Sequence, residues 1–130
     1  MADITPPLPE GRQIIQRYGG GGFRIAGTDH AGSVLVTPER TVAWGVSDAA
    51  AIDPASLTPL LAEAPERRSE GAVLLVGTGE AMVPLPPEVR QALRRAGFGV
   101  EIMDTGAACR TFNVLLAEER AVLAALIAVA

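Results

Sequence analysis

The tripeptide Asp104-Thr105-Gly106 is the stretch of this 130-residue chain whose residue types most directly suggest chemistry. Aspartic proteases carry Asp-Thr-Gly loops whose two paired carboxylates share one proton, and a dimer of this chain could supply both. That fold is all-β, however, and here the motif leads into a segment that we expect to be a long helix. The alternative is that Asp104 or Thr105 caps this helix by accepting hydrogen bonds from its free N–H groups. We favour the cap.

A second candidate is Gly77-Thr78-Gly79, which follows an apolar run typical of a buried strand. A dinucleotide-binding loop would need a third glycine and an immediate helix, but Met82 stands at that glycine's position and three prolines delay the helix. The chain has no lysine, so a phosphate-binding loop ending in Gly-Lys-Ser/Thr is excluded. We expect a structural turn rather than a nucleotide site.

The two loops are expected to meet at one edge of the sheet. If the strands before them are parallel, both loops lie at the carboxyl edge, where open α/β sheets place ligands. The helix that starts at the second loop would present free N–H groups to a small anion. The candidate ligand-binding residues are therefore Gly77, Thr78, Gly79, Asp104, Thr105, Gly106, Cys109 and Arg110.

Cys109 is the only cysteine and lies in the first turns of the expected helix, where the helix N-terminus could lower the pKa of its thiol. It shares a helical face with Phe112 and Leu116, which favours a buried core cysteine over a reactive thiol or redox sensor. One cysteine and one histidine, His30, cannot form a four-ligand zinc site. We expect no catalytic residues, no metal and no cofactor.

The N-terminal third has the glycine-punctuated pattern of β-hairpins. We expect strands at residues 13–18, 23–27, 33–37 and 40–44, with a turn cluster at residues 28–32. A short helix carrying three leucines should follow, and Ser56 is a better candidate for its cap than Asp53 because Pro59 must lie in the first turn.

The C-terminal part has the pattern of a βαβ unit. An apolar run at residues 71–77 predicts a strand buried on both faces; a helix beginning at Pro86-Pro87 and ending at Gly97 leads to a second strand at residues 100–104. These strands should be parallel with a right-handed crossover. We expect residues 105–129 to be helical, with a bend, a break or an exposed turn at Glu118-Glu119-Arg120.

Composition limits the remaining classes of function. The net charge is −4 and all 11 basic residues are arginines dispersed among glutamates, which argues against nucleic-acid binding. The longest apolar run is far shorter than the ~20 residues of a membrane span, and the N-terminus does not have the pattern of a signal peptide. We expect a flexible arm at residues 1–12, one domain at residues 13–130, and a cytoplasmic location.

One family accounts for these landmarks together. The chain resembles the Mth938-type domain family over residues 14–127, through Tyr18 and its glycine stretch, Gly32-Ser33-Val34-Leu35-Val36, Trp44, Gly77-Thr78-Gly79, and the segment from Asp104 to Asn113 and Leu116. The resemblance implies a three-layer α/β fold with a central mixed sheet, an N-terminal β-hairpin region and flanking helices. It implies no established enzymatic activity or cofactor.

The function that follows is a non-enzymatic protein-binding module. One mitochondrial branch of the family acts by protein contact in the assembly of a respiratory complex, which implies a protein partner or self-association for this chain. Val122, Leu126 and Ala130 could pack inward or against another chain. The alternative is a protein or enzyme that binds a small anion at the carboxyl edge.

Overall fold

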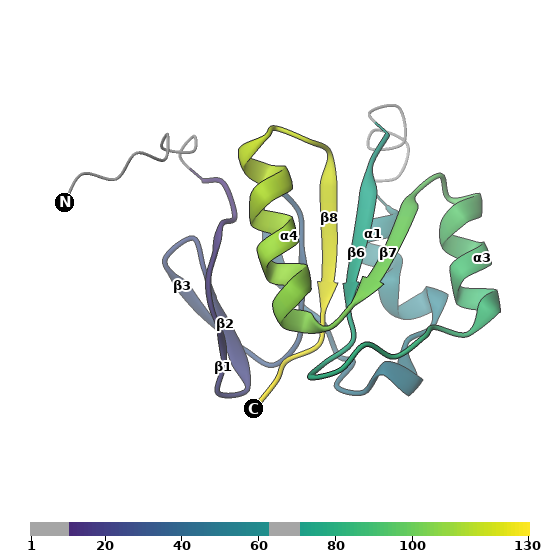
Figure 1. Cartoon of the computed structure of the whole chain (residues 1–130), viewed down its shortest axis with the longest axis horizontal. Coiled ribbons are helices and arrows are strands. Elements are labelled where there is room, and N and C mark those ends of the chain that lie inside the picture. Colours follow the sequence, from purple (N-terminus) through teal and green to yellow (C-terminus); the bar gives the residue numbers. More distant parts are fainter. Residues whose placement is uncertain (1–10, 63–70) are drawn as a thin grey trace.

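The computed structural model describes residues 11–62 and 71–130, so most of the N-terminal arm expected at residues 1–12 lies outside the described residues. Within these residues, eight strands form two sheets, which are arranged as Figure 1 shows. The three-stranded sheet consists of β1 (Ile15–Gly19), β2 (Gly22–Ile25) and β3 (Thr28–Ala31), all antiparallel. The five-stranded sheet has the order β5-β4-β8-β6-β7 and comprises β4 (Val34–Val36), β5 (Thr41–Ala43), β6 (Val73–Gly77), β7 (Gly99–Met103) and β8 (Val122–Leu126).

Helices cover both faces of the five-stranded sheet, which confirms the expected three-layer α/β arrangement. The helices are the 3-10 turns η1 (Ala49–Ala51) and η2 (Pro54–Leu57), and the α-helices α1 (Thr58–Leu61), α3 (Pro87–Arg95) and α4 (Thr105–Ala117). The layer containing η2, α1 and α3 packs on one face, and α4 packs on the other with the three-stranded sheet beside it (Figure 1).

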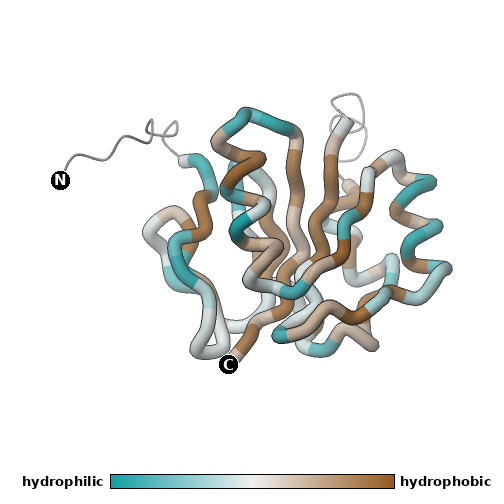
Figure 2. Tube along the Cα trace, in the orientation of Figure 1, coloured by the Kyte–Doolittle hydropathy of each residue, from teal (hydrophilic) through white to brown (hydrophobic). Residues whose placement is uncertain are grey.

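The central strands bury alternate side chains in two separate cores. In β6, Leu74 and Val76 pack towards α1 and α3, whereas Leu75 packs towards α4. In β8, Leu123 and Ala124 divide in the same way. Both faces of these strands are covered, and their sequences are accordingly apolar at every position rather than alternating with polar residues (Figure 2).

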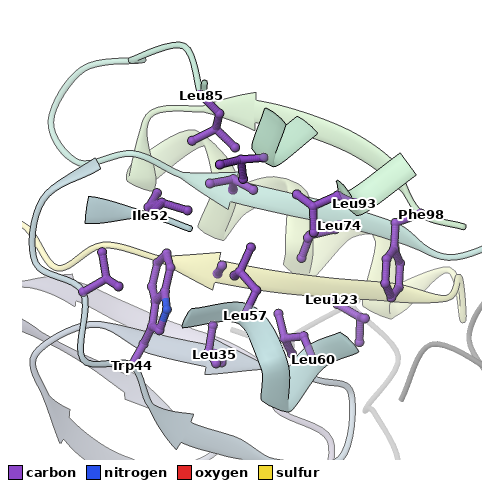
Figure 3. Close-up of a cluster of buried hydrophobic side chains, with 14 of the residues drawn as sticks. Leu35, Trp44, Ile52, Leu57, Leu60, Leu74, Leu85, Leu93, Phe98 and Leu123 are labelled. Atoms are coloured by element: carbon purple, nitrogen blue, oxygen red, sulfur yellow. The ribbon is translucent and has the colours of Figure 1, made fainter. Parts of the chain in front are cut away.

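The core on the α1 and α3 side includes Trp44, the only tryptophan (Figure 3). Its ring packs among leucines from the sheet and the short helices, while its indole N–H donates to the Ser56 carbonyl at 3.0 Å. The buried ring thus keeps its one polar group hydrogen-bonded and ties β5 to η2.

The βαβ unit forms as predicted. Strands β6 and β7 are parallel, and the helix between them buries Val89 and Leu93 against the sheet. Pro87 occupies the first helical turn, where its missing N–H is not needed, and Gly97 follows the helix with a φ of 97°.

The expectation of a helix over residues 105–129 is wrong in its second half. Helix α4 ends at Ala117, and the apolar run that follows is β8, which pairs parallel with β6 and antiparallel with β4. Val122 and Leu126 are therefore fully buried in the centre of the sheet, whereas Ala130 is exposed. A strand buried on both faces has no polar alternation, so its pattern resembles that of a buried helix.

Two local expectations are also wrong. Residues 28–31 form β3 rather than a turn cluster, because pairing with β2 stabilises an edge strand made of polar residues. The cap of the short helical segment is Asp53, whose carboxylate accepts from the Ser56 N–H at 2.8 Å. Ser56 completes this capping box by bonding back to Asp53, so it lies within the first turn. No helix among the described residues is long and apolar enough to cross a membrane.

Candidate functional site at the carboxyl edge of the sheet

The two predicted loops meet at the carboxyl edge of the five-stranded sheet. The Thr105 N–H donates to the Gly79 carbonyl at 2.8 Å, and the Gly79 N–H donates to the Thr105 hydroxyl at 2.9 Å. The loop after β6 is therefore bonded directly to the first turn of α4. This juxtaposition follows from the parallel pairing of β6 and β7.

Thr105 joins three segments of the chain. It is fully buried, and its hydroxyl donates to the Ile127 carbonyl at 2.7 Å while it accepts from Gly79. The donor and acceptor capacity of the hydroxyl thus connects the start of α4, the loop after β6 and the end of β8. A buried hydroxyl with both kinds of partner is a structural link.

Asp104 is the N-cap of α4. Its carboxylate accepts from the Ala107 N–H at 2.9 Å, and its carbonyl accepts from the Ala108 N–H at 3.0 Å. The chain then continues as a helix of 13 residues. The Asp-Thr-Gly tripeptide is therefore a helix start, as the capping interpretation predicted.

Gly106 leaves room for Tyr18 of the neighbouring sheet. A Cβ atom at Gly106 would lie 2.6 Å from the Tyr18 hydroxyl oxygen, closer than carbon and oxygen can approach. The Arg110 guanidinium donates a hydrogen bond to the same Tyr18 hydroxyl at 3.1 Å. Tyr18 and Arg110 therefore cover the first turn of α4, and Arg110 itself remains exposed.

The glycines and threonine of the first loop have packing roles. A Cβ atom at Gly77 would lie 3.0 Å from Thr105 and 3.1 Å from Leu126, and Gly79 has a φ of 109°. The Thr78 hydroxyl donates to the Ala81 carbonyl at 2.8 Å and accepts from the Val83 N–H at 2.9 Å. These bonds hold the loop in one shape before α3 begins.

Cys109 lies in the core between α4 and the sheet, with 2% of its surface exposed. Burial raises the pKa of its thiol from 9.0 to about 12, and the Asp104 carboxylate adds to that shift while Arg110 opposes it. The thiol is therefore protonated at neutral pH and is a poor nucleophile there. His30 lies on β3, in the other sheet.

Asn113 connects α4 to the three-stranded sheet. Its amide donates to the Ile15 carbonyl and accepts from the Ile15 N–H, both at 2.8 Å. The amide thus imitates a neighbouring strand for the start of β1. These two hydrogen bonds of Asn113, together with the bond from Arg110 to Tyr18, fix β1 along the length of α4.

A cleft of about 610 Å³ opens beside these loops. It is formed by residues 47–50, by the loop from Thr78 to Pro86, and by residues 127–130. The charged side chains among these residues are Asp48 and Glu80, both acidic. A smaller hollow of about 220 Å³ lies between Tyr18, Glu80 and the start of α4.

The structure therefore brings together all eight residues that the sequence predicted. Each of them has a structural role, and the polar side chains of Thr78, Asp104 and Thr105 are hydrogen-bonded to backbone groups of the chain itself. Their role in binding a ligand stays a prediction. Sequence reasoning missed Asp48 and Glu80, because Asp48 belongs to a turn 30 residues before the loop and carries no local motif.

The mixed sheet, the covering helix and the added three-stranded sheet define a distinct α/β class of domain. The chain belongs to the Mth938-type family, which is described as a protein family of unknown function (DUF498/DUF598) and whose model matches residues 15–127. The expected family membership is thereby confirmed.

The curated relatives include NADH dehydrogenase (ubiquinone) 1 alpha subcomplex assembly factor 3. The Homo sapiens protein is 40% identical over 87% of this chain and 59% of its own length, and the Xenopus tropicalis protein is 37% identical over 88% and 60%. This chain thus spans about 60% of the length of those relatives. An uncharacterised Rhodobacter capsulatus protein is 38% identical over 87% of this chain and 82% of its own length.

Solved structures have the same fold. A Bartonella henselae protein described as an outer membrane protein matches with a TM-score of 0.81 and 40% identity, over 93% of this chain and 98% of its own. A Bordetella pertussis protein described as an Mth938-like domain matches with a TM-score of 0.80 and 30% identity, over 98% and 92%.

Proposed function

We propose that this chain is a non-enzymatic protein-binding module that takes part in assembling a respiratory complex, the NADH dehydrogenase. The observation that carries the proposal is the similarity to an assembly factor of that complex, at 37–40% identity over 87–88% of this chain. Because the similarity covers 87–88% of this chain, the surfaces by which such a factor contacts its partners would lie on the same fold.

The use of the motif residues supports this proposal. The side chains of Thr105 and Asp104 are hydrogen-bonded to backbone groups of the domain itself, and the thiol of Cys109 is buried and protonated. Two of the exposed apolar side chains belong to the loop that forms the cleft: 56% of Met82 and 42% of Val83 is accessible to water. Exposed apolar groups of this kind favour contact with another protein.

A cytoplasmic location is part of the proposal, since the partner would have to meet this domain on the same side of the membrane. Self-association is the alternative form of protein contact. It predicts a concentration-dependent mass in solution rather than a second kind of subunit.

Affinity capture tests the proposal. The tagged chain would be expressed in a respiring bacterium that contains NADH dehydrogenase, and the proteins retained under mild conditions would be quantified by mass spectrometry. We expect enrichment of NADH dehydrogenase subunits over the same tag on an unrelated α/β domain. Reproducible capture of a co-expressed untagged copy of the chain and of no other protein would favour self-association, and capture of neither that copy nor the subunits would overturn the proposal.

A further inference from the structure

We propose that the cleft at the carboxyl edge binds a segment of a protein partner that presents a cationic side chain, arginine or lysine, between aliphatic residues. The inference rests on the proposed function only in taking the occupant to be a protein. It adds where on this domain the partner binds and which side chains the partner must present there.

The charges of the cleft define the cationic part of the occupant. Asp48 and Glu80 approach it from different segments, both are exposed, and no arginine lines it. In the part of the chain that the structure describes, neither carboxylate forms an ion pair. Two unpaired carboxylates in a concave site attract a cation and repel an anion.

The walls of the cleft define the aliphatic part. Apart from the two carboxylates, the cleft is lined largely by apolar groups, among them Val83, Pro84 and Ile127. An arginine or lysine side chain can lay its methylene stem along such a surface while its charged end reaches a carboxylate. The volume of about 610 Å³ lies within the range of about 300–1,000 Å³ that is usual for binding clefts.

The rim of the cleft points to a protein rather than to a small molecule. Val83, which lines the cleft, is 42% exposed, and Met82 next to it in the chain is 56% exposed. The hydrogen bonds of the Thr78 hydroxyl to Ala81 and Val83 hold this loop, so the apolar rim is presented in a fixed shape. A small ligand would leave the rim uncovered, whereas a peptide segment crossing the cleft would bury it.

A peptide titration followed by nuclear magnetic resonance tests the site. The probes are two capped tripeptides, acetyl-Leu-Arg-Val-amide and acetyl-Leu-Glu-Val-amide, added to the isotope-labelled chain at millimolar concentration. We expect saturable shifts from the arginine peptide at the amides of Asp48, Glu80 and Val83, and at least about tenfold weaker binding of the glutamate peptide.

The double variant Asp48→Asn with Glu80→Gln should weaken binding of the arginine peptide by about tenfold or more. Asparagine keeps the capping bond that the Asp48 carboxylate accepts from the Ala50 N–H, so the turn should survive. The matched control is Asp53→Asn with Glu88→Gln, which changes another capping aspartate and another exposed glutamate that do not line the cleft. It should leave binding unchanged.

Three results would overturn the inference: no shifts at any of these amides, equal binding of the two peptides, or equal loss of binding in the control variant. The outcome separates the site from the proposed function. If the tagged chain captures NADH dehydrogenase subunits but the arginine peptide does not bind, the site is wrong and the function stands. If the peptide binds selectively but capture fails, the function is wrong and the site stands.

Discussion

The start of α4 and the cleft beside it occupy the same edge of the sheet but use their polar groups in opposite ways. At the start of α4, Thr105 and Asp104 are bonded to backbone groups within the domain, as is Asn113 further along the helix. In the cleft, the carboxylates of Asp48 and Glu80 are exposed to solvent, and only that of Asp48 also accepts a backbone hydrogen bond, from the Ala50 N–H. The residues with a recognisable motif therefore stabilise the fold, and residues without a motif form the open surface.

The largest contrast should be in thiol chemistry. Because the pKa of the Cys109 thiol is raised to about 12, its thiolate fraction at pH 8 is roughly a thousandfold below that of a thiol with a pKa of 9.0. We expect alkylation in the native chain to be slower than in urea by at least about that factor, because the buried thiol is also shielded from the reagent. Rapid alkylation of the native chain would show that the α4 region opens.

The same pKa shift gives a dependence of stability on pH. The folded pKa is raised above the unfolded one, so the stability that burial of the neutral thiol contributes is complete below pH 9.0 and is lost as pH rises through about 12. Cys109→Ala should remove this part of the alkaline decline in the free energy of unfolding, which urea denaturation at several pH values would measure.

Thr105→Val should destabilise the chain by about 2–4 kcal/mol, because the nearly isosteric side chain leaves the Gly79 N–H and the Ile127 carbonyl without their partner. Urea denaturation would measure the change. Thr105→Ser keeps the hydroxyl and should cost clearly less. Equal effects of the two substitutions would mean that the methyl group, rather than the hydrogen bonds, stabilises this junction.

Gly106→Ala should have opposite signs in two backgrounds. In the native chain the new methyl group meets Tyr18, and we expect a loss of about 1 kcal/mol. In a Tyr18→Ala background the obstacle is absent, and the better helix propensity of alanine should raise stability by up to about 1 kcal/mol. A double-mutant cycle by thermal denaturation tests this reversal, and the same sign in both backgrounds would contradict it.

Glu119→Gly should stabilise the chain by about 0.5–1 kcal/mol. Glu119 has a φ of 57° after the end of α4, in a position that usually holds glycine. The Arg120 N–H bonds to the Leu115 carbonyl and the Glu119 N–H to the Leu116 carbonyl, which is the pattern of a Schellman motif. Thermal denaturation would measure the gain, and Glu118→Gly, one residue earlier, should not produce it.

The smallest effect should come from the cleft. Asp48→Asn with Glu80→Gln should change the free energy of unfolding by no more than about 0.5 kcal/mol, because both side chains are exposed and the asparagine can still cap its turn. A loss comparable to that of Thr105→Val would mean that these carboxylates have a structural role, and the contrast between the two regions would disappear.

The sequence predicted the parts of the fold that carry local signals. Pro87 and Gly97 mark the ends of α3, and glycines bound the apolar run of β6, so the βαβ unit could be predicted. At the end of α4 the charged run Glu118-Glu119-Arg120 predicted an interruption, which the structure confirms, but no glycine marked it as the end of the helix, because the residue in the left-handed conformation is Glu119. The uninterrupted apolar run of β8 then resembled a continuation of the helix.

The candidate site, too, could be predicted only where the sequence carries a local signal. That the Gly77–Gly79 loop and the start of α4 would meet followed from strand direction alone, and the cap at Asp104 followed from its position before a helix. The contact between Gly106 and Tyr18 joins residues 88 positions apart in the sequence, and the cleft collects three distant segments. Only the packed chain reveals such neighbours.

The position of β8 has a consequence for how the domain is made. Among the strands of the described residues this one comes last along the chain, yet it lies at the centre of its sheet between β4 and β6. Before it is synthesised, the β4–β5 pair and the β6–β7 pair have no strand to join them, and their apolar edges are exposed. Folding during translation should therefore be delayed until residues 122–126 emerge from the ribosome, and a nascent chain halted earlier should be a preferred substrate for chaperones.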